Sequence, residues 1–283
     1  MRLVSYVKTG QQSFGMLVPG GLIDLADVTG CKTLKEAIAS GVLEMLSEDI
    51  DTPPAEFSLA DVTLLPVIPD PAKIMCIGVN YHDHRKETGR PKVDHPTVFV
   101  RYPDSQIAHR QPLIKPSRSE RFDFEGEMAI VIGEGGRNIT KDTALNHVAG
   151  YACYVDGSVR NYQRHSSQFL PGKTFPGTGA FGPCLVTPDE VGDYRDLVLQ
   201  TRLNGETVQE APLSDMIFPV EELIEYCSQF TPLSAGDVIV TGTPGGVGDK
   251  REPPLYMQEG DVLEVEIGLL GTLVNPVVAE DSL

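Results

Sequence analysis

Short apolar runs alternate with Gly- and Pro-rich turns along most of this 283-residue chain. From residue 74 onward the runs are rich in β-branched residues and bounded by turn residues, which is the pattern of strands. Only 143–148 and 220–230 have the apolar spacing of helices in this part of the chain. Many short strands with few crossover helices argue against a doubly wound parallel sheet. They predict a β-rich α+β fold, a mixed roll or distorted barrel. The strands are expected within 74–79, 96–102, 124–133, 147–156, 182–188, 198–205, 236–244 and 261–278.

The first 70 residues have the pattern of a smaller unit. Three strand-like runs at 3–7, 14–18 and 22–25 are separated by turns. Helical spacing follows over 33–48, with Thr33 suited to cap the helix. Prolines at 66, 69 and 71 then favour an extended connector. We therefore expect a small N-terminal α/β domain with its connector over 1–70, and a catalytic domain over 71–283.

Composition narrows the classes of partner. The net charge is −17, from 23 Lys and Arg against 40 Asp and Glu. Such a surface repels nucleic acid and anionic lipid, so we expect neither as a partner. The five cysteines are scattered without a CxxC pair, as in reduced cytosolic proteins. The opening MRLVSYVKTG lacks a targeting pattern, and no apolar run approaches the length of a membrane span. These features predict a cytoplasmic protein.

Three acids stand in front of a strongly apolar run in RFDFEGEMAIVI, residues 121–132. If the segment is one extended strand, Asp123, Glu125 and Glu127 lie on one face, with buried apolar neighbours. Like charges roughly 7 Å apart repel in a low-dielectric interior, so a cation must compensate them or their pKa values must rise. Oxygen ligands point to Mg²⁺, Mn²⁺ or Ca²⁺. The alternative is an edge strand whose polar face is solvated.

Asp156 is a further candidate ligand, at the end of the apolar run YACYV. An acid followed by glycine can also form a turn. The sequence alone does not place Asp156 beside Glu125 and Glu127, so both interpretations stay open.

His84 and Glu87 lie three residues apart in NYHDHRKETG, which reads as a turn followed by a helical segment. On one helix face they can form a hydrogen bond. A carboxylate that orients an imidazole makes a general base for water. The alternative is a solvated helix face, because HDHRKE is polar throughout; His82 points elsewhere.

Two Gly-rich segments add candidate substrate contacts. Lys173, in GKTFPGTG, is suited to an anionic substrate group or is an exposed loop lysine. VTGTPGGVGDK lacks the Gly-Lys-Ser/Thr ending of a phosphate loop and no helix follows, which excludes a nucleotide site. Its free backbone N–H groups and the Thr243 hydroxyl can still bind a carboxylate or an enolate oxygen.

The order of these motifs is more specific than any one of them. GVNYHDHRKETG, FDFEGEMAIVIG, VDGSVRNYQ, GKTFPGTGAFGP and VIVTGTPGGVG follow one another between about Lys73 and Val278. This series resembles the fumarylacetoacetate hydrolase family, in particular its small prokaryotic-type acylpyruvases and 2-hydroxyhepta-2,4-diene-1,7-dioate isomerases. The resemblance implies a β-rich roll with a Mg²⁺ site at its open end, a 2-oxo acid substrate, a role in aromatic compound catabolism and a homodimer.

The resemblance also assigns roles to residues. It implies that the metal carboxylates are Glu125, Glu127 and Asp156. It implies catalytic roles for His84, Glu87 and Lys173, and substrate contacts from Arg160, Gln163, Lys173 and Thr243. Asp83 is expected near the metal without belonging to its ligands.

The chain departs from the family pattern near the substrate. Val155 and Gly157 stand where members often carry Asn and Val, and TFPGTG replaces an Asp-Thr pair after Lys173. These changes leave the metal residues intact and concern the choice of substrate.

The leading expectation is a divalent-metal-dependent hydrolase that cleaves a C–C bond of an acylpyruvate-type 2,4-diketo acid. A cation that chelates the 2-oxo acid stabilises the enolate that forms, while His84 and Glu87 activate water. One alternative on the same site is a decarboxylase of an oxaloacetate-type 2-oxo diacid or a hydroxymuconate-type isomerase. Another is a metal-binding scaffold without catalysis.

Overall fold

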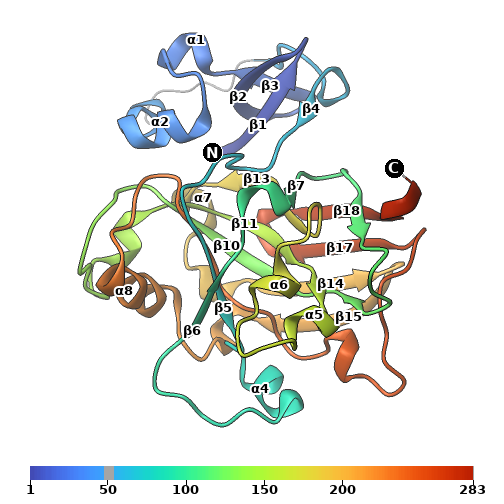
Figure 1. The fold of residues 1–283 in the computed structure, drawn as a ribbon. Helices are drawn as coiled ribbons and strands as arrows, with labels where there is room; N and C mark the ends of the chain where they lie inside the picture. The colour runs from blue at the N-terminus through green and yellow to red at the C-terminus, as the bar shows by residue number, and fades with distance from the viewer. Residues whose placement is uncertain (48–53, 283) are drawn as a thin grey trace.

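The computed structural model describes residues 1–47 and 54–282, and in these residues the strands form three sheets (Figure 1). The 11-stranded sheet has the order β3-β2-β1-β13-β11-β10-β16-β5-β6, with β4 paired to β1 and β7 to β13. Its strands are β1 (Arg2–Lys8), β2 (Gln11–Val18), β3 (Gly21–Asp24), β4 (Thr63–Leu64), β5 (Ile74–Gly78), β6 (Thr97–Val100), β7 (Gln106–Ile107), β10 (Gly126–Ile132), β11 (Val148–Asp156), β13 (Gly179–Val186) and β16 (Val238–Val240).

A five-stranded sheet has the order β15-β14-β17-β18-β8, and a third sheet has two short strands. The five are β8 (Leu113–Lys115), β14 (Val198–Leu203), β15 (Glu206–Pro212), β17 (Val262–Ile267) and β18 (Thr272–Ala279). The two are β9 (Phe122–Asp123) and β12 (Ser158–Val159). The helices are α1 (Ala26–Thr29), α2 (Leu34–Ser40), α3 (Val42–Ser47), α4 (His82–Thr88), α5 (Arg160–Gln163), α6 (Leu170–Lys173), α7 (Pro188–Val191) and α8 (Val220–Phe230).

The strand-rich α+β fold predicted from the sequence is confirmed. Most neighbouring strands run antiparallel, and the parallel pairs are β16–β5, β13–β7 and β18–β8. The large sheet ends at β3 on one side and β6 on the other, so in the described residues it is an open sheet rather than a closed barrel.

Two hydrophobic cores lie on the two faces of the large sheet. On β10, Met128 and Ile130 belong to a core shared with the five-stranded sheet and α8. Ala129 and Val131 belong to a second core, shared with the N-terminal strands and α2. Both faces are therefore buried, which explains why β10 is an almost continuous apolar run. Glu127 lies on the same face of β10 as Ala129 and Val131, because side chains alternate along a strand. Its side chain is therefore buried.

The N-terminal strands are continuous with the large sheet, because β1 pairs with β13 from Arg2↔Val186. The large sheet contains strands from both sides of residue 70. The expected division into two domains at this residue stays a prediction. Thr33 caps α2 as predicted, and its hydroxyl accepts the N–H of Glu36 over 3.1 Å. The single helix expected over 33–48 was wrong: Gly41 adopts a left-handed conformation and separates α2 from α3. Glu48 lies outside the described residues.

The other sequence predictions have mixed outcomes. The helix predicted at 220–230 is confirmed as α8, whereas 143–148 forms only a 3₁₀ turn, Ala144–His147. The edge strand β15 was missed, because its mostly polar sequence ETVQEAP has no apolar alternation to reveal it. Among the described helices, none combines the length and apolar character needed to cross a membrane.

Candidate active site

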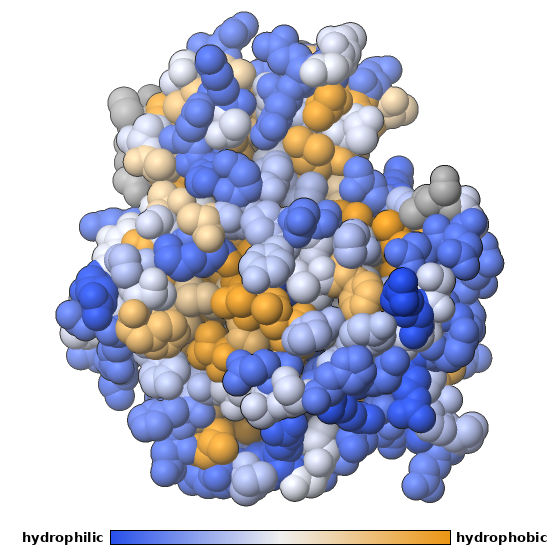
Figure 2. Space-filling model, in the orientation of Figure 1, coloured by the Kyte–Doolittle hydropathy of each residue, from blue (hydrophilic) through white to orange (hydrophobic). Residues whose placement is uncertain are grey.

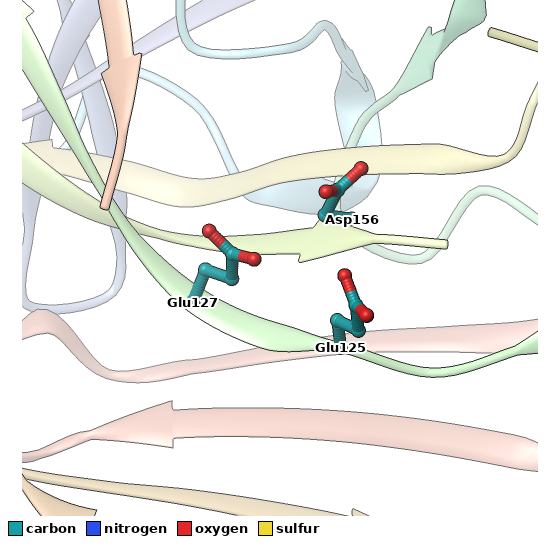
Figure 3. Close-up of side chains that lie close together, drawn as sticks. All are labelled: Glu125, Glu127 and Asp156. Carbon is teal, nitrogen blue, oxygen red and sulfur yellow. The ribbon is translucent and has the colours of Figure 1, made fainter. Parts of the chain in front are cut away.

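Three buried acids come together where β10 and β11 pair (Figure 3). Gly126 pairs with Val155, so Glu125 faces Asp156 across the two strands, and the N–H of Asp156 donates to the Glu125 carbonyl over 2.9 Å. Glu127 lies two residues along β10. One carboxylate oxygen from each of the three lies within 4.8 Å of the others, and all three residues are at most 5% exposed. The antiparallel register therefore brings Asp156 beside the other two acids, which the sequence left open.

Glycine is required between the two glutamates. A Cβ atom at Gly126 would lie 2.0 Å from Oγ1 of Thr201, which comes from β14 of the other sheet. The Glu-Gly-Glu pattern therefore reflects the close approach of the two sheets at the site.

The expectation that Asp123 shares the face of Glu125 and Glu127 was wrong. The segment is not one strand: β9 ends at Asp123, and β10 begins at Gly126. Asp123 binds Arg160 instead, with 2.7 Å between Oδ2 and Nε, and accepts the N–H groups of Gly248 and Asp249. Arg160 Nη2 lies 2.7 Å from both Asp123 Oδ2 and Glu125 Oε1, so the arginine links Asp123 to the acid group.

Two further cations compensate the acids. Lys173 Nζ forms ion pairs with Glu125 and with Asp156, the latter at 2.6 Å. It lies in α6 and is 1% exposed, so the exposed-loop alternative for this lysine was wrong. Arg101, which the sequence analysis missed, places Nη1 2.6 Å from Asp156 Oδ1 and is also buried. Its sequence context, VFVRYPD, carried no signal beyond a charge directly after an apolar run.

Four buried carboxylates therefore face three buried cations. They are Asp123, Glu125, Glu127 and Asp156 against Arg101, Arg160 and Lys173.

Glu127 carries the uncompensated charge. Burial and the nearby Asp156 and Glu125 carboxylates raise the pKa of Glu127 well above its usual value. Burial acts on Glu125 in the same direction, but Lys173 and Arg160 outweigh it and lower the pKa of Glu125 to about 2. Oε2 of Glu127 accepts the N–H of Gly242 over 2.6 Å, which leaves Oε1 for a cation. The uncompensated charge and the oxygen-only donors fit Mg²⁺ or Mn²⁺, so the three acids could hold a divalent metal ion.

The predicted His–Glu pair lies beside the acids. His84 and Glu87 are on α4, and His84 Nδ1 lies 2.7 Å from Glu87 Oε1. His84 is 5% exposed, so the alternative of a solvated helix face does not hold for it. Asp83, on the same helix, is exposed and paired with Lys86. Asp83 does not lie with Glu125, Glu127 and Asp156, and it was not predicted to be a metal ligand.

One cavity of about 360 Å³ collects most of the predicted residues. It is lined by His84, Glu125, Glu127, Arg160, Gln163, Lys173 and Thr243, together with apolar side chains such as Phe99 and Phe169. Gln163 accepts a hydrogen bond from Arg160 Nη1 over 3.0 Å. Residues from distant parts of the sequence thus surround one space next to the acids.

Several of the donors expected of the Gly-rich loop after β16 are used within the protein. The N–H groups of Gly242, Gly246 and Gly248 donate to Glu127, Glu87 and Asp123 respectively. The Thr243 hydroxyl donates to the carbonyl of Gly126 over 2.9 Å. The loop therefore positions three carboxylates of the site, and the binding of a substrate oxygen by its other N–H groups stays a prediction.

Steric crowding explains why Gly157 stands where family members often carry Val. A Cβ atom there would lie 2.2 Å from the carbonyl oxygen of Thr178, so the Val of other sequences does not fit this backbone. Val155 is fully buried in the core. Neither change reaches the three acids.

With this geometry in place, comparison with known proteins identifies the chain. Residues 73–278 match the family described as fumarylacetoacetate (FAA) hydrolase C-terminal. The chain belongs to the fumarylacetoacetate hydrolase family. The family resemblance noted from the sequence is thereby confirmed.

Curated members of the family resemble the chain over most of its length. It is 37% identical to the mitochondrial oxaloacetate tautomerase fahd2 of Xenopus laevis, over 98% of this chain and 90% of that one. It is 40% identical to the oxaloacetate tautomerase YisK of Bacillus subtilis, over 78% of this chain and 75% of that one.

Solved structures of the family share the whole fold. The fumarylacetoacetate hydrolase of Exiguobacterium antarcticum has a TM-score of 0.87 at 35% identity, covering 99% of this chain and 100% of that one. A 2-hydroxyhepta-2,4-diene-1,7-dioate isomerase of Mycobacterium marinum has a TM-score of 0.78 at 29% identity, with 99% of both chains covered. A maleylpyruvate hydrolase of Sphingobium sp. SYK-6, solved with manganese(II) and pyruvate, has a TM-score of 0.80 at 25% identity, again with 99% of both chains covered.

Proposed function

We propose that this family member is a divalent-metal-dependent enzyme that interconverts the keto and enol forms of a 2-oxo diacid of the oxaloacetate type. The observation that carries the proposal is one cavity lined by His84, Glu125 and Glu127. Glu87 is hydrogen-bonded to His84, and Asp156 completes the group of three acids. The names of the curated relatives support the same reaction. C–C hydrolysis, the leading expectation from the sequence, becomes the second candidate.

A metal ion held by Glu125, Glu127 and Asp156 would supply Lewis-acid polarisation of the 2-oxo group. His84 is the proposed base. Its Nδ1 is engaged by Glu87, which leaves Nε2 to take a proton from the carbon beside the oxo group. Arg160 and Lys173 are the buried cations next to the acids, and we assign them to the substrate carboxylate. The contact of Arg160 Nη1 with Gln163 is the bond that a substrate would replace.

The mouth of the cavity favours a second carboxylate on the substrate. Arg90, Arg164 and Lys250 line it and are exposed, although the chain as a whole carries a charge of −17. Arg164 already pairs with Asp249, so Arg90 and Lys250 are the cations left for a ligand. A local excess of positive charge on an acidic protein draws anions to that opening. This positive charge would not stabilise the binding of a substrate that carries an apolar acyl group there.

The test starts from the enol form of oxaloacetate. Loss of its absorbance is followed with EDTA-treated protein and with protein reloaded with Mg²⁺ or Mn²⁺, while lactate dehydrogenase reports any pyruvate. Metal-dependent loss of enol without pyruvate supports tautomerisation. Pyruvate and CO₂ would identify a decarboxylase instead. No acceleration with either metal would overturn the proposal.

Hydrolysis remains the second candidate because the His84–Glu87 pair is intact and can also orient a water molecule. A panel of acylpyruvates tests it: pyruvate plus a carboxylic acid, lost with EDTA, would establish C–C hydrolysis. A non-catalytic scaffold would bind the metal without responding further to oxalate in a thermal unfolding experiment. The His84→Ala variant should lose either activity and keep the metal-induced shift in melting temperature.

We also propose a homodimer, as the family resemblance implies. β6 is an edge strand of the large sheet with Val100 42% exposed, and Figure 2 shows hydrophobic surface in the middle of the face where β6 lies in Figure 1. An apolar edge of this kind needs a cover. Light scattering on protein eluted from a size-exclusion column, with Val100→Asp as the disrupting variant, tests the oligomeric state.

The cytoplasmic location is likewise a proposal, and some relatives are named as mitochondrial. Cell fractionation tests it.

A further inference from the structure

A second cavity lies behind the His–Glu pair. It measures about 340 Å³ and is lined by residues that include Tyr81, Asp83, Glu87, Glu210, Ala211 and Asp215. The wall between the two cavities is built by α4 and the Gly-rich loop. Thr243 and Val247 of this loop line the first cavity, whereas Pro244 to Gly246 line the second. Neighbouring residues of one loop therefore line different cavities.

The His84–Glu87 hydrogen bond crosses this wall. His84 lines the first cavity and is 5% exposed. The Glu87 side chain is 23% exposed and lines the second cavity. Oε1 of Glu87 lies 2.7 Å from His84 Nδ1, and its Oε2 accepts the Gly246 N–H over 2.9 Å. Both oxygens are therefore held in place, and of the two cavities Glu87 lines only the second.

The two openings differ in charge. Arg90, Arg164 and Lys250 line the first cavity, which suits the entry of an anion. The second carries Asp83, Glu87, Glu210 and Asp215, against Lys86 and His82. Lys86 is already paired with Asp83 over 2.8 Å. A negative opening repels an anionic substrate and attracts protons and small cationic acids.

We propose that Glu87 relays protons between His84 and the second cavity, so that His84 exchanges protons with solvent while substrate fills the first cavity. The proposal rests on the proposed function, in which a proton must leave a substrate carbon. The proton from the C–H bond goes to Nε2 of His84, the proton on Nδ1 goes to Oε1 of Glu87, and Glu87 gives one proton to water in the second cavity. The enolate oxygen takes a proton from water as the enol leaves the first cavity. In the opposite direction the enol oxygen loses that proton on binding and the relay runs in reverse to the carbon, so each turnover takes up one proton for each one it releases.

The experiment measures the keto–enol rate at saturating oxaloacetate, constant pH and constant ionic strength, as a function of imidazole concentration. The metal-loaded wild type should be fast and insensitive to imidazole. Glu87→Ala should be at least tenfold slower, and imidazole should restore the rate in a saturable way, because the truncation opens the second cavity to His84. Glu206→Gln, an exposed glutamate on β15, is the matched control and should behave as wild type.

A second substitution tests the route. Ala211→Phe, in the Glu87→Ala background, narrows the second cavity and should remove the rescue, while leaving the melting temperature and the metal-induced shift unchanged.

A Glu87→Ala rate that is low and does not respond to imidazole would overturn the relay, because a carboxylate that only orients His84 predicts that result. Rescue that survives Ala211→Phe would overturn the route through the second cavity. If the wild type itself does not accelerate the keto–enol interconversion, the proposed function is wrong. A wild type that is active while Glu87→Ala fails to respond to imidazole shows instead that only the relay is wrong.

Discussion

The backbone N–H of Asp156 donates to the carbonyl oxygen of Glu125 over 2.9 Å, and Lys173 forms an ion pair with both side chains. The same two residues are therefore joined by the sheet and by a buried cation. Backbone pairing sets the spacing of the two residues, and the lysine holds their carboxylates.

Glu127 should control metal binding. Replacing it by Gln keeps its size but removes the charge that the buried cations do not balance. A metal present at 100 times its Kd stabilises a folded protein by about 2.7 kcal/mol. The wild type should show this stabilisation with Mg²⁺ or Mn²⁺ in thermal unfolding, and Glu127→Gln should lose most of it. Glu206→Gln should keep the full shift; an unchanged shift in Glu127→Gln would remove Glu127 from the ligand set.

Arg101 should be essential to stability. Its guanidinium is buried and pairs with Asp156 over 2.6 Å. Removing one partner of a buried pair leaves the other charge uncompensated, which costs about 3–5 kcal/mol. Arg101→Met should lower the free energy of unfolding by that amount in urea titrations. The exposed Arg118→Met is the control, and equal stability of both variants would show that Lys173 alone suffices for Asp156.

Gly126 and Thr201 should be coupled. A Cβ atom at residue 126 would meet Thr201 Oγ1 at 2.0 Å, so Gly126→Ala should destabilise the fold by about 1–3 kcal/mol. Thr201→Ala removes the clashing oxygen. The double variant should therefore be more stable than Gly126→Ala alone, and a double-mutant cycle in urea measures the coupling. Strict additivity of the two changes would contradict the close approach of the sheets at this point.

His109 should make stability depend on pH. Burial, followed by the charge of Arg110, lowers the pKa of His109 from 6.5 to about 4. Between these values the unfolded chain binds a proton that the folded chain does not, so the free energy of unfolding falls as the pH falls from 6.5 to 4. Since the ring is partly exposed, we expect a loss of about 1 kcal/mol from this residue.

The variant His109→Asn isolates this contribution. Its amide oxygen can accept the Val274 N–H that lies 3.1 Å from His109 Nδ1, but it does not titrate. Its unfolding free energy should fall less between pH 6.5 and 4 than that of the wild type. His82→Asn, at an exposed position, should fall as much as the wild type.

The cations at the mouth should select diacids. Arg90→Ala and Lys250→Ala should each raise KM for oxaloacetate about fivefold, the equivalent of about 1 kcal/mol for an exposed charge contact. The value of kcat should change little, because neither residue is assigned a part in the proton transfer or in holding the metal. The exposed Lys141→Ala is the control for loss of one positive charge. Unchanged KM values would remove the second carboxylate from the proposed substrate.

The sequence alone determined the local elements and the candidate chemistry. The apolar spacing of 220–230 predicted α8, and the β-branched runs predicted most strands of the two larger sheets, because periodicity records which side of an element is buried. Motif order identified the family. His84 and Glu87 could be paired from their spacing, since three residues on a helix return to the same face.

Tertiary structure decided which of these residues meet. Asp156 joins Glu125 through the register of β10 and β11. The apolar pattern of each strand fixes which face is buried, but it does not say which residues of the two strands stand opposite each other. Arg101 reaches Asp156 from a segment 55 residues earlier, and a lone arginine after an apolar run carries no periodic signal. Asp123 does not lie with Glu125 and Glu127, because β9 ends at Asp123 and β10 begins only at Gly126. Its carboxylate forms an ion pair with Arg160 instead. Contacts between distant segments depend on the packing of whole sheets, so only the fold could place a second cavity behind His84.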